Sequence, residues 1–387
     1  MFHARFHSSI AEISASIWDD LFTGDNPFIR HDFLLVLEKS CCVSEQTGWL
    51  PQHLLLYDNQ QPVAALPLYL KLHSQGEFVF DWGWADAFHR HGLEYYPKLL
   101  TAIPFTPSTG PRIGIARDAD KSRVLEAVFE QVRHKAGEMG CSSWHLLFPE
   151  PDLAKALATM GSDQLLLRQD VQFHWFNHGY SDFDDYLAAF RSSRRKNIKR
   201  ERKAVKNQGI TLERKTGSEI GPQDWSAFYK CYCNTYLKHS GHPGYLNRQF
   251  FDLLLEAMSE SLMLVVAYHE EQVVASSLFF YDSKRLYGRY WGSLSDIDYL
   301  HFEACFYQGI EFCIERGIAE FDPGTQGEHK LLRGFEPDTT CSYHWISNPG
   351  FHAAIAGFLE SEKPNIKAYG EQAADFLPFR KDRKPDL

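Results

Sequence analysis

The sequence contains no segment of the kind that inserts into or crosses a membrane. No stretch reaches the roughly 18 uncharged apolar residues that a membrane-spanning helix needs. Residues 1–6, Met-Phe-His-Ala-Arg-Phe, lack the apolar core of a secretory signal peptide. Both absences predict a cytoplasmic protein without a transmembrane segment.

The sequence is also poor in patterns that bind metals or DNA. Its eight cysteines form no CxxC pair and show no regular spacing, which is typical of free thiols in a reducing compartment. His239 and His242 have no third ligand nearby in the sequence, so we expect no metal. The net charge of −10 argues against a DNA-binding surface.

What the sequence does contain is enough apolar material for two cores. It has 387 residues, more than one domain usually holds, and 44% of them are hydrophobic. In the first half, the patterns predict a helix over 12–40, strands over 53–57, 62–70 and 78–82, a helix over 121–140 and a strand over 144–148. In the second half, they predict helices over 225–236 and 246–258, strands over 262–268, 273–281 and 285–292, a helix over 299–317 and a strand over 319–322.

The order of elements in the two halves is the same. The segments 57–65 and 268–276 align without a gap around a turn, and each is followed by a strand carrying Trp-Gly. We therefore predict a duplicated α/β unit with a mixed sheet in each copy. Repeat one would cover residues 1–175, and residues 176–387 would hold a linker helix and repeat two.

The linker is strongly basic. An apolar stripe predicts one helix over 183–209. From Arg191 to Lys206 it has nine basic residues against one acid, Glu201, a net charge of +8. The phosphates of a donor or of a lipid-linked acceptor would be natural partners, although a solvated helix face has a similar composition.

Three segments of the second half carry a family resemblance: the basic helix 194–200, the helix 300–317, and Phe321-Asp322-Pro323-Gly324 with Lys330, Gly334 and Phe335 shortly after. With them, this half resembles the FemAB-like branch of the GNAT acyltransferase superfamily, whose members pair two GNAT folds in one chain. In the first half, residues 47–51, 80–85 and 104–107 resemble a subgroup known mainly as predicted peptidoglycan biosynthesis or recognition proteins.

The resemblance implies two tandem GNAT-like folds and an N-acyltransferase that moves an acyl or aminoacyl group from an activated donor to an amine. It implies acyl-CoA or aminoacyl-tRNA as co-substrate and no tightly bound cofactor. Lys330 matches the lysine to which the family assigns binding or stabilisation of anionic charge. Two superfamily features are absent: the Gly-rich pyrophosphate loop used for coenzyme A, and the long helical arm of some tRNA-dependent relatives.

The polar run 322–335 is the first candidate for the chemistry. Acyl transfer needs a base for the amine proton, a proton donor for the leaving group and hydrogen bonds to the oxyanion. Glu328 or His329 could be the base, and Tyr290 could protonate the leaving group. Lys330 completes the catalytic set, and Gln326 and Arg333 of the same run would bind substrate.

Further substrate contacts are expected in both halves. In the first half, Asp81, Trp82, Trp84 and Asp86 would end a strand, where indoles flanked by carboxylates suit a sugar or an amine, or form a Trp-rich core. Arg112, in a rigid loop, could hold a phosphate or belong to a structural turn. In the second half, acceptor contacts are expected from a loop over the site and from the strand beside it. The loop would supply Tyr236, His239, His242 and Tyr245, and the strand Arg289 and Trp291.

The donor is expected at the basic helix and at a helix N-terminus. Arg194, Arg195 and Lys199 offer positive charge, and Ser293 and Ser295 precede the 299–317 helix, whose free N–H groups could hold phosphate. Asp296 or Asp298 could instead cap that helix and occupy the same donors.

Three functions are therefore open. The first is acyl-CoA-dependent N-acyl transfer, with a small-molecule donor and an amine acceptor. A cell-wall precursor is one candidate for that acceptor. The second changes the donor to aminoacyl-tRNA, which adds an amino acid to a peptidoglycan precursor. The third is a non-catalytic protein that binds a peptidoglycan fragment through its aromatic clefts.

Overall fold

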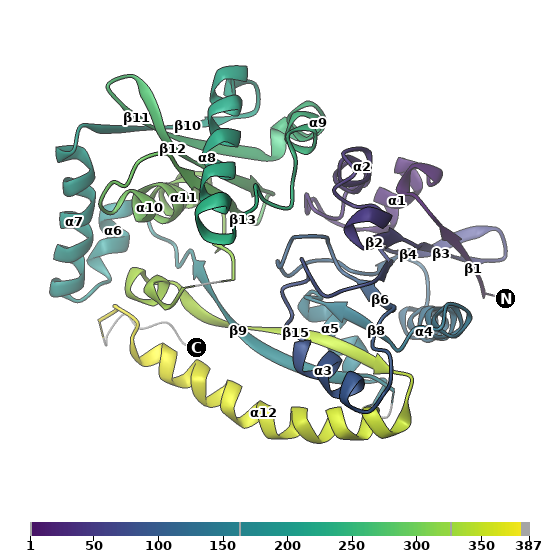
Figure 1. Ribbon diagram of the computed structural model, residues 1–387. Coiled ribbons are helices and arrows are strands. Elements are labelled where there is room, and N and C mark those ends of the chain that lie inside the picture. Colours follow the sequence, from purple (N-terminus) through teal and green to yellow (C-terminus); the bar gives the residue numbers. More distant parts are fainter. Residues whose placement is uncertain (1, 162–163, 326, 381–387) are drawn as a thin grey trace. The chain divides into compact units, whose positions relative to one another are not determined.

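The computed structural model describes residues 2–161, 164–325 and 327–380, and it contains two compact units (Figure 1). Unit 1 comprises Met1–Asp170 and Thr339–Lys367, and unit 2 comprises Val171–Asp338 and Ala368–Leu387. The chain passes between units within β9 (Leu166–Phe176), β15 (Glu336–Ile346) and α12 (Pro349–Asp375). None of the helices in the described ranges is both long and apolar enough to cross a membrane.

Unit 1 contains two groups of paired strands. The first has the order β1-β3-β4-β7 and is antiparallel throughout. The second has the order β2-β5-β6-β8-β15, in which only β6 and β8 run parallel. The bounds are β1 (Phe2–His7), β2 (Trp49–Pro51), β3 (His53–Asp58), β4 (Gln61–Leu66), β5 (Tyr69–Lys71), β6 (Lys98–Thr101), β7 (Gly114–Ile115) and β8 (Ser143–Leu147).

The helices of unit 1 cover a core of aliphatic side chains. The longest that lies wholly in the unit, α4 (Lys121–Glu138), buries Val124, Val128 and Val132 at helical spacing, and Asp120 caps its first turn. The other helices are α1 (Ala15–Leu21), α2 (His31–Lys39), α3 (Trp82–Arg90) and α5 (Pro151–Ala158), with short 3-10 turns at Ile10–Glu12 and Glu45–Thr47.

Unit 2 contains strands in the order β10-β11-β12-β13-β14-β9. All neighbouring pairs are antiparallel except β13 and β14, which run parallel. Most of β11 and β12 is buried, as expected for central strands covered on both faces. The bounds are β10 (Ile210–Thr216), β11 (Leu262–His269), β12 (Gln272–Tyr281), β13 (Arg285–Ser293) and β14 (Glu320–Asp322).

Helix α8 (Pro222–Ser240) packs closely on β13. A Cβ atom at Gly292 would lie 2.0 Å from the backbone of Cys231, so only glycine permits this approach. The remaining helices are α6 (Phe183–Ala188), α7 (Ser192–Asn207), α9 (Arg248–Met258), α10 (Leu300–Phe302), a π-helix at Glu303–Tyr307, α11 (Gln308–Arg316), and 3-10 turns at Gly217–Glu219, Ser259–Ser261 and Glu328–Arg333.

The expected α/β class with mixed sheets is confirmed, and so are the two hairpins at 57–65 and 268–276. In each unit, one parallel strand pair follows the hairpin: β6 with β8 in unit 1, and β13 with β14 in unit 2. The order of elements that suggested duplication is therefore visible in the strand pairing.

Four expected elements are wrong in detail. The strand over 62–70 is two, β4 and β5. The single helix over 12–40 is two, α1 and α2, because Gly24 has a φ of +108° and Pro27 cannot donate a helical hydrogen bond. The strand over 78–82 does not form, because Phe78 has a φ of +63° and Asp81 is the N-cap of α3. The helix over 183–209 is divided into α6 and α7, since the Arg191 N–H donates to the carbonyl of Pro378.

The helix expected over 299–317 is present but irregular. It begins with the three residues of α10, continues as the π-helix Glu303–Tyr307, and becomes regular only in α11. π-Helical turns inside α-helices frequently occur at functional sites. This one faces the pocket that is described next.

Candidate active site

A pocket of about 280 Å³ opens at the parallel strand pair of unit 2. Its walls come from β12, β13, α10, the π-helix, and the loop and 3-10 turn that follow β14. The end of a strand beside a parallel neighbour is a common position for sites in α/β folds. The lining residues are Ser277, Leu278, Phe279, Gly288, Arg289, Tyr290, Trp291, His301, Cys305, Phe306, Pro323, His329 and Lys330.

Lys330 presents the only ammonium group among the described lining residues. Its side chain is 2% exposed, and Nζ donates to the carbonyl of Gly324 at 2.5 Å. Burial lowers the Lys330 pKa to about 8, against an opposing effect of the Asp322 carboxylate, which raises it. At neutral pH the group is mostly charged, yet poorly solvated.

Two imidazoles share this pocket with Lys330. The ring centroids of His301 and His329 lie 6.0 Å apart. Burial, followed by the charges of His329, Arg333 and Lys330, lowers the His301 pKa to about 4. Burial and the same two cations lower the His329 pKa below its usual value. Both rings are therefore neutral at pH 7 and able to accept a proton.

Cys305 and Ser277 form a polar contact at the pocket wall, with Sγ and Oγ 3.2 Å apart. Burial raises the Cys305 pKa to about 12, opposed by the Ser277 hydrogen bond and by Lys330. Because the nucleophilic form of cysteine is the thiolate, this thiol is poorly suited to form a covalent acyl intermediate at neutral pH. The pocket instead suits direct attack by an external nucleophile.

A buried charged layer supports the Lys330 loop. His174 on β9 lies 2.9 Å from Glu320, 3.2 Å from Asp338 and 3.7 Å from Asp322. Burial alone would lower the His174 pKa, but Asp322 and the hydrogen bonds to Asp338 and Glu320 raise it to about 10. Asp322 in turn accepts the Gly324 N–H at 2.8 Å, so the turn bearing the Lys330 acceptor is fixed from below.

The expected residues on β13 do meet the loop at this pocket. Arg289, Tyr290 and Trp291 line it together with His329 and Lys330. Strand alternation does not exclude any of the three, because the β12–β13 register shifts between Leu278 and Phe279. The structure thus brings five of the expected residues into one pocket.

The expected loop over the site is mostly helix. Tyr236 and His239 belong to the last turns of α8, and only His242 and Tyr245 lie in the following loop. The rings of Tyr236, His242 and Tyr245 pack at centroid distances of 5.4–6.3 Å, while His239 is exposed. Tyr232 connects this group to the pocket wall, since its ring lies 4.7 Å from Tyr236 and 5.6 Å from Tyr290.

Arg333 was expected to bind substrate, but its guanidinium is committed to other protein groups. It donates to Glu201 of α7 at 2.9 and 3.0 Å, to the Tyr307 hydroxyl at 3.0 Å and to the His329 carbonyl at 2.9 Å. It also lies 3.4 Å above the Phe302 ring. These contacts give Arg333 a positioning role, because they tie the basic helix and the π-helix to the Lys330 loop.

One other residue of the polar run, Glu328, does not line the pocket. Glu328 is exposed and accepts a hydrogen bond from Tyr369 at 3.0 Å, and it is not among the lining residues. Gln326 lies outside the described residues. His329 is thus the better placed of the two candidate bases.

The basic helix α7 is held to the rest of unit 2 by two buried apolar residues and by one of its arginines. Ile198 and Val205 are buried, and Arg202 binds Glu303 at 2.8 Å and Glu311 at 2.6 Å on the π-helix and α11. Lys199 pairs with the exposed Asp184. The other basic side chains of α7 have no ion-pair partner within the described ranges: Arg194, Arg195, Lys196, Arg200, Lys203 and Lys206.

The helix N-terminus expected to hold phosphate is not built for it. Helix α10 has three residues before the π-helix begins, and its N-cap, Tyr299, has a φ of +64° and no side-chain cap, so neither Asp296 nor Asp298 fills that place. The Ser293 hydroxyl donates to the Val274 carbonyl, and Ser295 donates its N–H to Ser293. Both serines thus serve the local turn.

Residues 9–381 match a protein family described as peptidoglycan biosynthesis/recognition, under the name FemAB-like. The match covers nearly the whole sequence. The chain belongs to the FemAB-like family.

Solved structures with the same fold agree with this assignment. FemX aligns at a TM-score of 0.53 with 11% identity, over 92% of this chain and 100% of FemX. The C-terminal domain of an Agrobacterium fabrum protein that carries the name lysylphosphatidylglycerol synthetase aligns at 0.53 with 12% identity, over 91% and 97%. A conserved Bacteroides thetaiotaomicron protein of unknown function aligns at 0.52 with 12% identity, over 89% and 99%. Among proteins with curated functions, none matches significantly.

These findings confirm the expected resemblance to the FemAB-like family, and the structures named here share the mixed α/β fold of this chain over most of its length. At 11–12% identity the structural likeness shows the fold alone.

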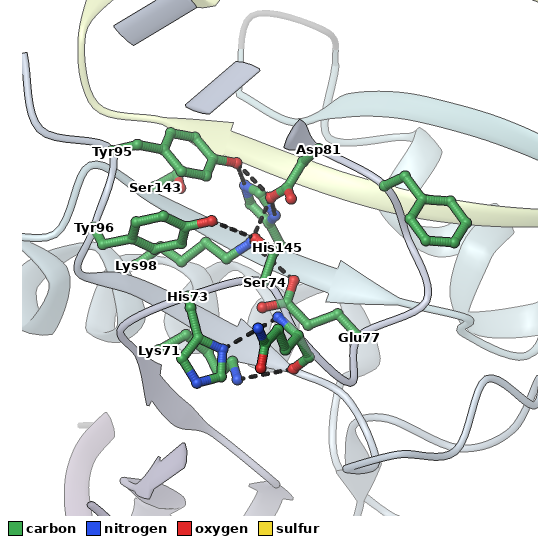
Figure 2. A network of polar contacts seen from close by, with 12 residues as sticks. Lys71, His73, Ser74, Glu77, Asp81, Tyr95, Tyr96, Lys98, Ser143 and His145 are labelled. Atoms are coloured by element: carbon green, nitrogen blue, oxygen red, sulfur yellow. Dashed lines mark hydrogen bonds and ion pairs between the residues drawn. The ribbon is translucent and has the colours of Figure 1, made fainter. Parts of the chain in front are cut away.

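Unit 1 of the FemAB-like chain contains a second polar network, buried under the loop between β5 and α3 (Figure 2). Lys98 on β6 donates to Glu77 and Ser74, each at 2.8 Å, and to Asp81. The Tyr95 hydroxyl donates to the same Asp81 carboxylate at 2.6 Å. Burial would lower the Lys98 pKa, but Glu77 and Asp81 outweigh it and raise that pKa.

The surroundings of this network are strongly desolvated. Burial lowers the Lys71 pKa to about 7 and raises the Glu77 pKa to about 7, each opposed by the oppositely charged neighbours. Lys71 lies 3.6 Å above the Trp49 ring. His145 approaches Asp81 at 3.6 Å, and burial and Lys98 keep its pKa well below the usual value.

The expected residues of the first half do not gather into a site. Asp81 belongs to the Lys98 network, and Trp84 is buried against His344 at a centroid distance of 4.8 Å. Trp82 is 48% exposed on α3, and Asp86 pairs with the exposed Arg90. Arg112 is 1% exposed and donates to the carbonyls of Leu147, Pro111 and Ser108, so it fixes a turn instead of holding a phosphate.

Among the described residues, two groups have the composition of a metal site, one in each unit. They are Glu77, Asp81 and His145, and His174, Glu320 and Asp338. In each group a protein cation already contacts the carboxylates: Lys98 in the first, and Arg285, 2.6 Å from Glu320, in the second. We assign a metal to neither group.

Sequence reasoning missed the partners that complete both sites. His301 and Cys305 were included in a helix pattern, and His174 and Lys98 lie in strands that were not expected. A histidine on the buried face of a helix beside the polar run was the one available signal for His301. No local pattern marks Lys98, because its partners come from the loop 72–81 and depend on the strand register.

Proposed function

We propose that this FemAB-like chain is an N-acyltransferase whose reaction takes place in the pocket of unit 2. One observation carries the proposal: a buried ammonium, Lys330, shares a small pocket with two neutral imidazoles, His301 and His329. An ammonium can stabilise a developing oxyanion, and a neutral imidazole can accept the proton of an attacking amine. Those are the two tasks of direct acyl transfer.

The proposed reaction begins with attack of a neutral amine on the donor carbonyl carbon. A C–N bond forms, and Lys330 donates a hydrogen bond to the oxyanion. His329 takes the proton that the amine nitrogen loses. The bond between carbon and the leaving sulfur or oxygen then breaks, and the Tyr290 hydroxyl protonates the leaving group and regains a proton from His329 through solvent.

The donor is proposed to be an acyl-CoA, bound with help from the outer face of α7. Helix α7 contacts the π-helix, which forms part of the pocket wall, through the ion pair of Arg202 with Glu303. A donor whose phosphates bind α7 would therefore lie partly outside the pocket. The chain charge of −10 favours a small polyanion over tRNA. An aminoacyl-tRNA donor remains the alternative, because the basic stripe suits any polyanion.

The acceptor is proposed to be an amine of a peptidoglycan precursor, which rests on the description of the family. The same description includes recognition, so a binding protein without turnover is the competing function. The aromatic group around Tyr236, Tyr245 and His242 offers faces for a sugar or a peptide near the pocket wall.

Calorimetric titration with acetyl-CoA, alanyl-tRNA and a muropeptide separates these readings. We expect micromolar binding of acetyl-CoA and formation of an amide when the muropeptide is added, as seen by mass spectrometry. Salt-sensitive binding of alanyl-tRNA without binding of acetyl-CoA would overturn the donor assignment. Muropeptide binding alone, with no product from either donor, would overturn catalysis.

A further inference from the structure

A histidine and a lysine of unit 2 share one carboxylate, that of Asp322. Its Oδ1 atom lies 3.7 Å from Nε2 of His174 on β9, and the same oxygen accepts the Gly324 N–H at 2.8 Å. The carbonyl of Gly324 accepts a hydrogen bond from Nζ of Lys330. A continuous series of contacts therefore runs from His174 through Asp322 and Gly324 to the ammonium group at the pocket.

His174 is held as a cation more firmly than Lys330. Its ring is 1% exposed, and its Nδ1 lies 2.9 Å from Glu320 and 3.2 Å from Asp338. Burial lowers the His174 pKa, but Asp322 and the hydrogen bonds to Asp338 and Glu320 raise it to about 10. Burial lowers the Lys330 pKa to about 8. The two pKa values therefore stand in the reverse of the order that histidine and lysine have in water.

The groups around these two cations come from strands β13, β14 and β15 and from the helical segments that flank the pocket. The titratable and charged groups that face His174 are Glu320, Asp322 and Asp338, those that face Lys330 are Asp322, Cys305, His301 and His329, and Arg285 and Tyr287 also face Asp322. Only Asp322 belongs to the first two sets. Two cations that share one anion repel each other, so each limits the stabilisation that the other receives.

We propose that His174 is a positioning residue of the acyl-transfer site, whose imidazolium binds Asp322, fixes the Gly324 turn and limits the stabilisation that Asp322 gives to the Lys330 ammonium. This inference rests on the proposed function, because it takes Lys330 as the donor to the oxyanion. It deepens that function by naming the residue that keeps this donor acidic. An ammonium of lowered pKa shares its proton with an oxyanion more readily.

The test compares two substitutions of His174 that differ in charge. His174→Gln removes the cation and keeps a hydrogen-bond donor, whereas His174→Lys keeps a cation at this position. The Lys330 pKa is followed in the full-length protein by NMR of lysine labelled at Cε, with the Lys330 signal assigned by its loss in Lys330→Met. We expect this pKa to rise by roughly one pH unit in His174→Gln, because the carboxylates then act on Lys330 without an opposing charge. In His174→Lys it should stay near the wild-type value.

His178→Gln is the matched control. It makes the same substitution in the loop that follows β9, where His178 pairs with Glu336 at 2.7 Å and is not one of the groups around Asp322. The Lys330 pKa should not change in this variant. The alkaline limb of kcat/KM should move to higher pH in His174→Gln and stay in place in the control.

An unchanged Lys330 pKa in His174→Gln would overturn the inference. An equal rise in His174→Gln and His174→Lys would also overturn it, because the effect would then come from packing and not from charge. The wild-type protein supplies a test that needs no variant to fold: the His174 Cε1 signal should remain that of an imidazolium well above pH 7, and titration near the ordinary histidine pKa would refute the inference. A raised Lys330 pKa in a protein that forms no amide would support the link to His174 and overturn the proposed function.

Discussion

Lys330 combines two properties that rarely occur in one side chain: it is 2% exposed and it is charged at neutral pH. Burial strengthens its interaction with any negative charge that develops in the pocket. Asp322 prevents burial from neutralising it, because this carboxylate raises the Lys330 pKa. The residue is therefore poised between a charged and a neutral form close to physiological pH.

This balance predicts the alkaline limb of the pH profile. Only the ammonium form can donate to the oxyanion with a positive charge, so kcat/KM should fall as pH rises through about 8. In Asp322→Asn the carboxylate that raises the Lys330 pKa is gone, and the limb should move to lower pH. Measuring kcat/KM across a pH series for both proteins checks this. An alkaline limb at the same pH in Asp322→Asn would contradict it.

Lys98 in unit 1 shows the same physics inside a fully buried polar network. Its ammonium is fully buried and pairs with one carboxylate oxygen each of Glu77 and Asp81. The other oxygens, Glu77 Oε1 and Asp81 Oδ1, have no hydrogen-bond partner within the described residues. A buried pair of this kind adds little net stability over an apolar core, but removing one partner leaves uncompensated charge.

We therefore predict that Lys98→Met lowers the free energy of unfolding by about 3–5 kcal/mol, as breaking a buried ion pair does. The triple variant Lys98→Met, Glu77→Gln, Asp81→Asn should recover part of that loss, because no carboxylate is left without its Lys98 partner. Urea unfolding followed by circular dichroism measures both, with the exposed Lys121→Met as control. A loss no larger than that of the control would refute the account.

At the scale of elements, the two faces of α7 have different roles. Its inner face is fixed by Arg202 with Glu303 and Glu311 and by Glu201 with Arg333, while most of its other cations have no ion-pair partner in the part of the chain that the structure describes. The single acid in the basic run, Glu201, thus has a structural reason to be there. A ligand on the outer face would bind a helix that is tied to the Lys330 loop through Arg333.

The outer face of α7 should contribute to donor binding. Changing Arg195 and Lys199 to Glu should weaken binding of acetyl-CoA by at least tenfold, and the remaining affinity should depend less on salt, because fewer counterions are released. Calorimetry at 50 and 300 mM NaCl measures both effects. The pair Arg117→Glu and Lys121→Glu, exposed in unit 1, makes the same charge change and should do little. Equal weakening in both pairs would point to net charge alone.

At the scale of the whole molecule, the sequence predicted the elements whose signals are local. The hairpins at 57–65 and 268–276 follow from a polar turn between apolar strands, and α8 and α9 follow from helical periodicity. The pairing of β9 with β14 and of β15 with β8 could not be predicted, because it joins segments more than 140 residues apart.

The site was predictable where one run of sequence supplies it. His329, Lys330, Tyr290 and Trp291 were expected from the polar run and its neighbouring strand, and they line one pocket. Arg333 and Asp81 were misassigned because their partners, Glu201 and Lys98, lie 132 and 17 residues away. A charge in a sequence looks available for substrate until its partner in the fold is known.

Acyl transfer that depends on Lys330 is tested most directly by the variant Lys330→Met. The measurement is the rate of amide formation from acetyl-CoA and an amine acceptor by the wild type, by Lys330→Met and by the exposed control Lys284→Met. We predict a loss of about a hundredfold or more in kcat for Lys330→Met, the cost of one oxyanion donor, with an unchanged far-UV spectrum and an unaffected control. Wild-type rates in Lys330→Met would contradict the claim.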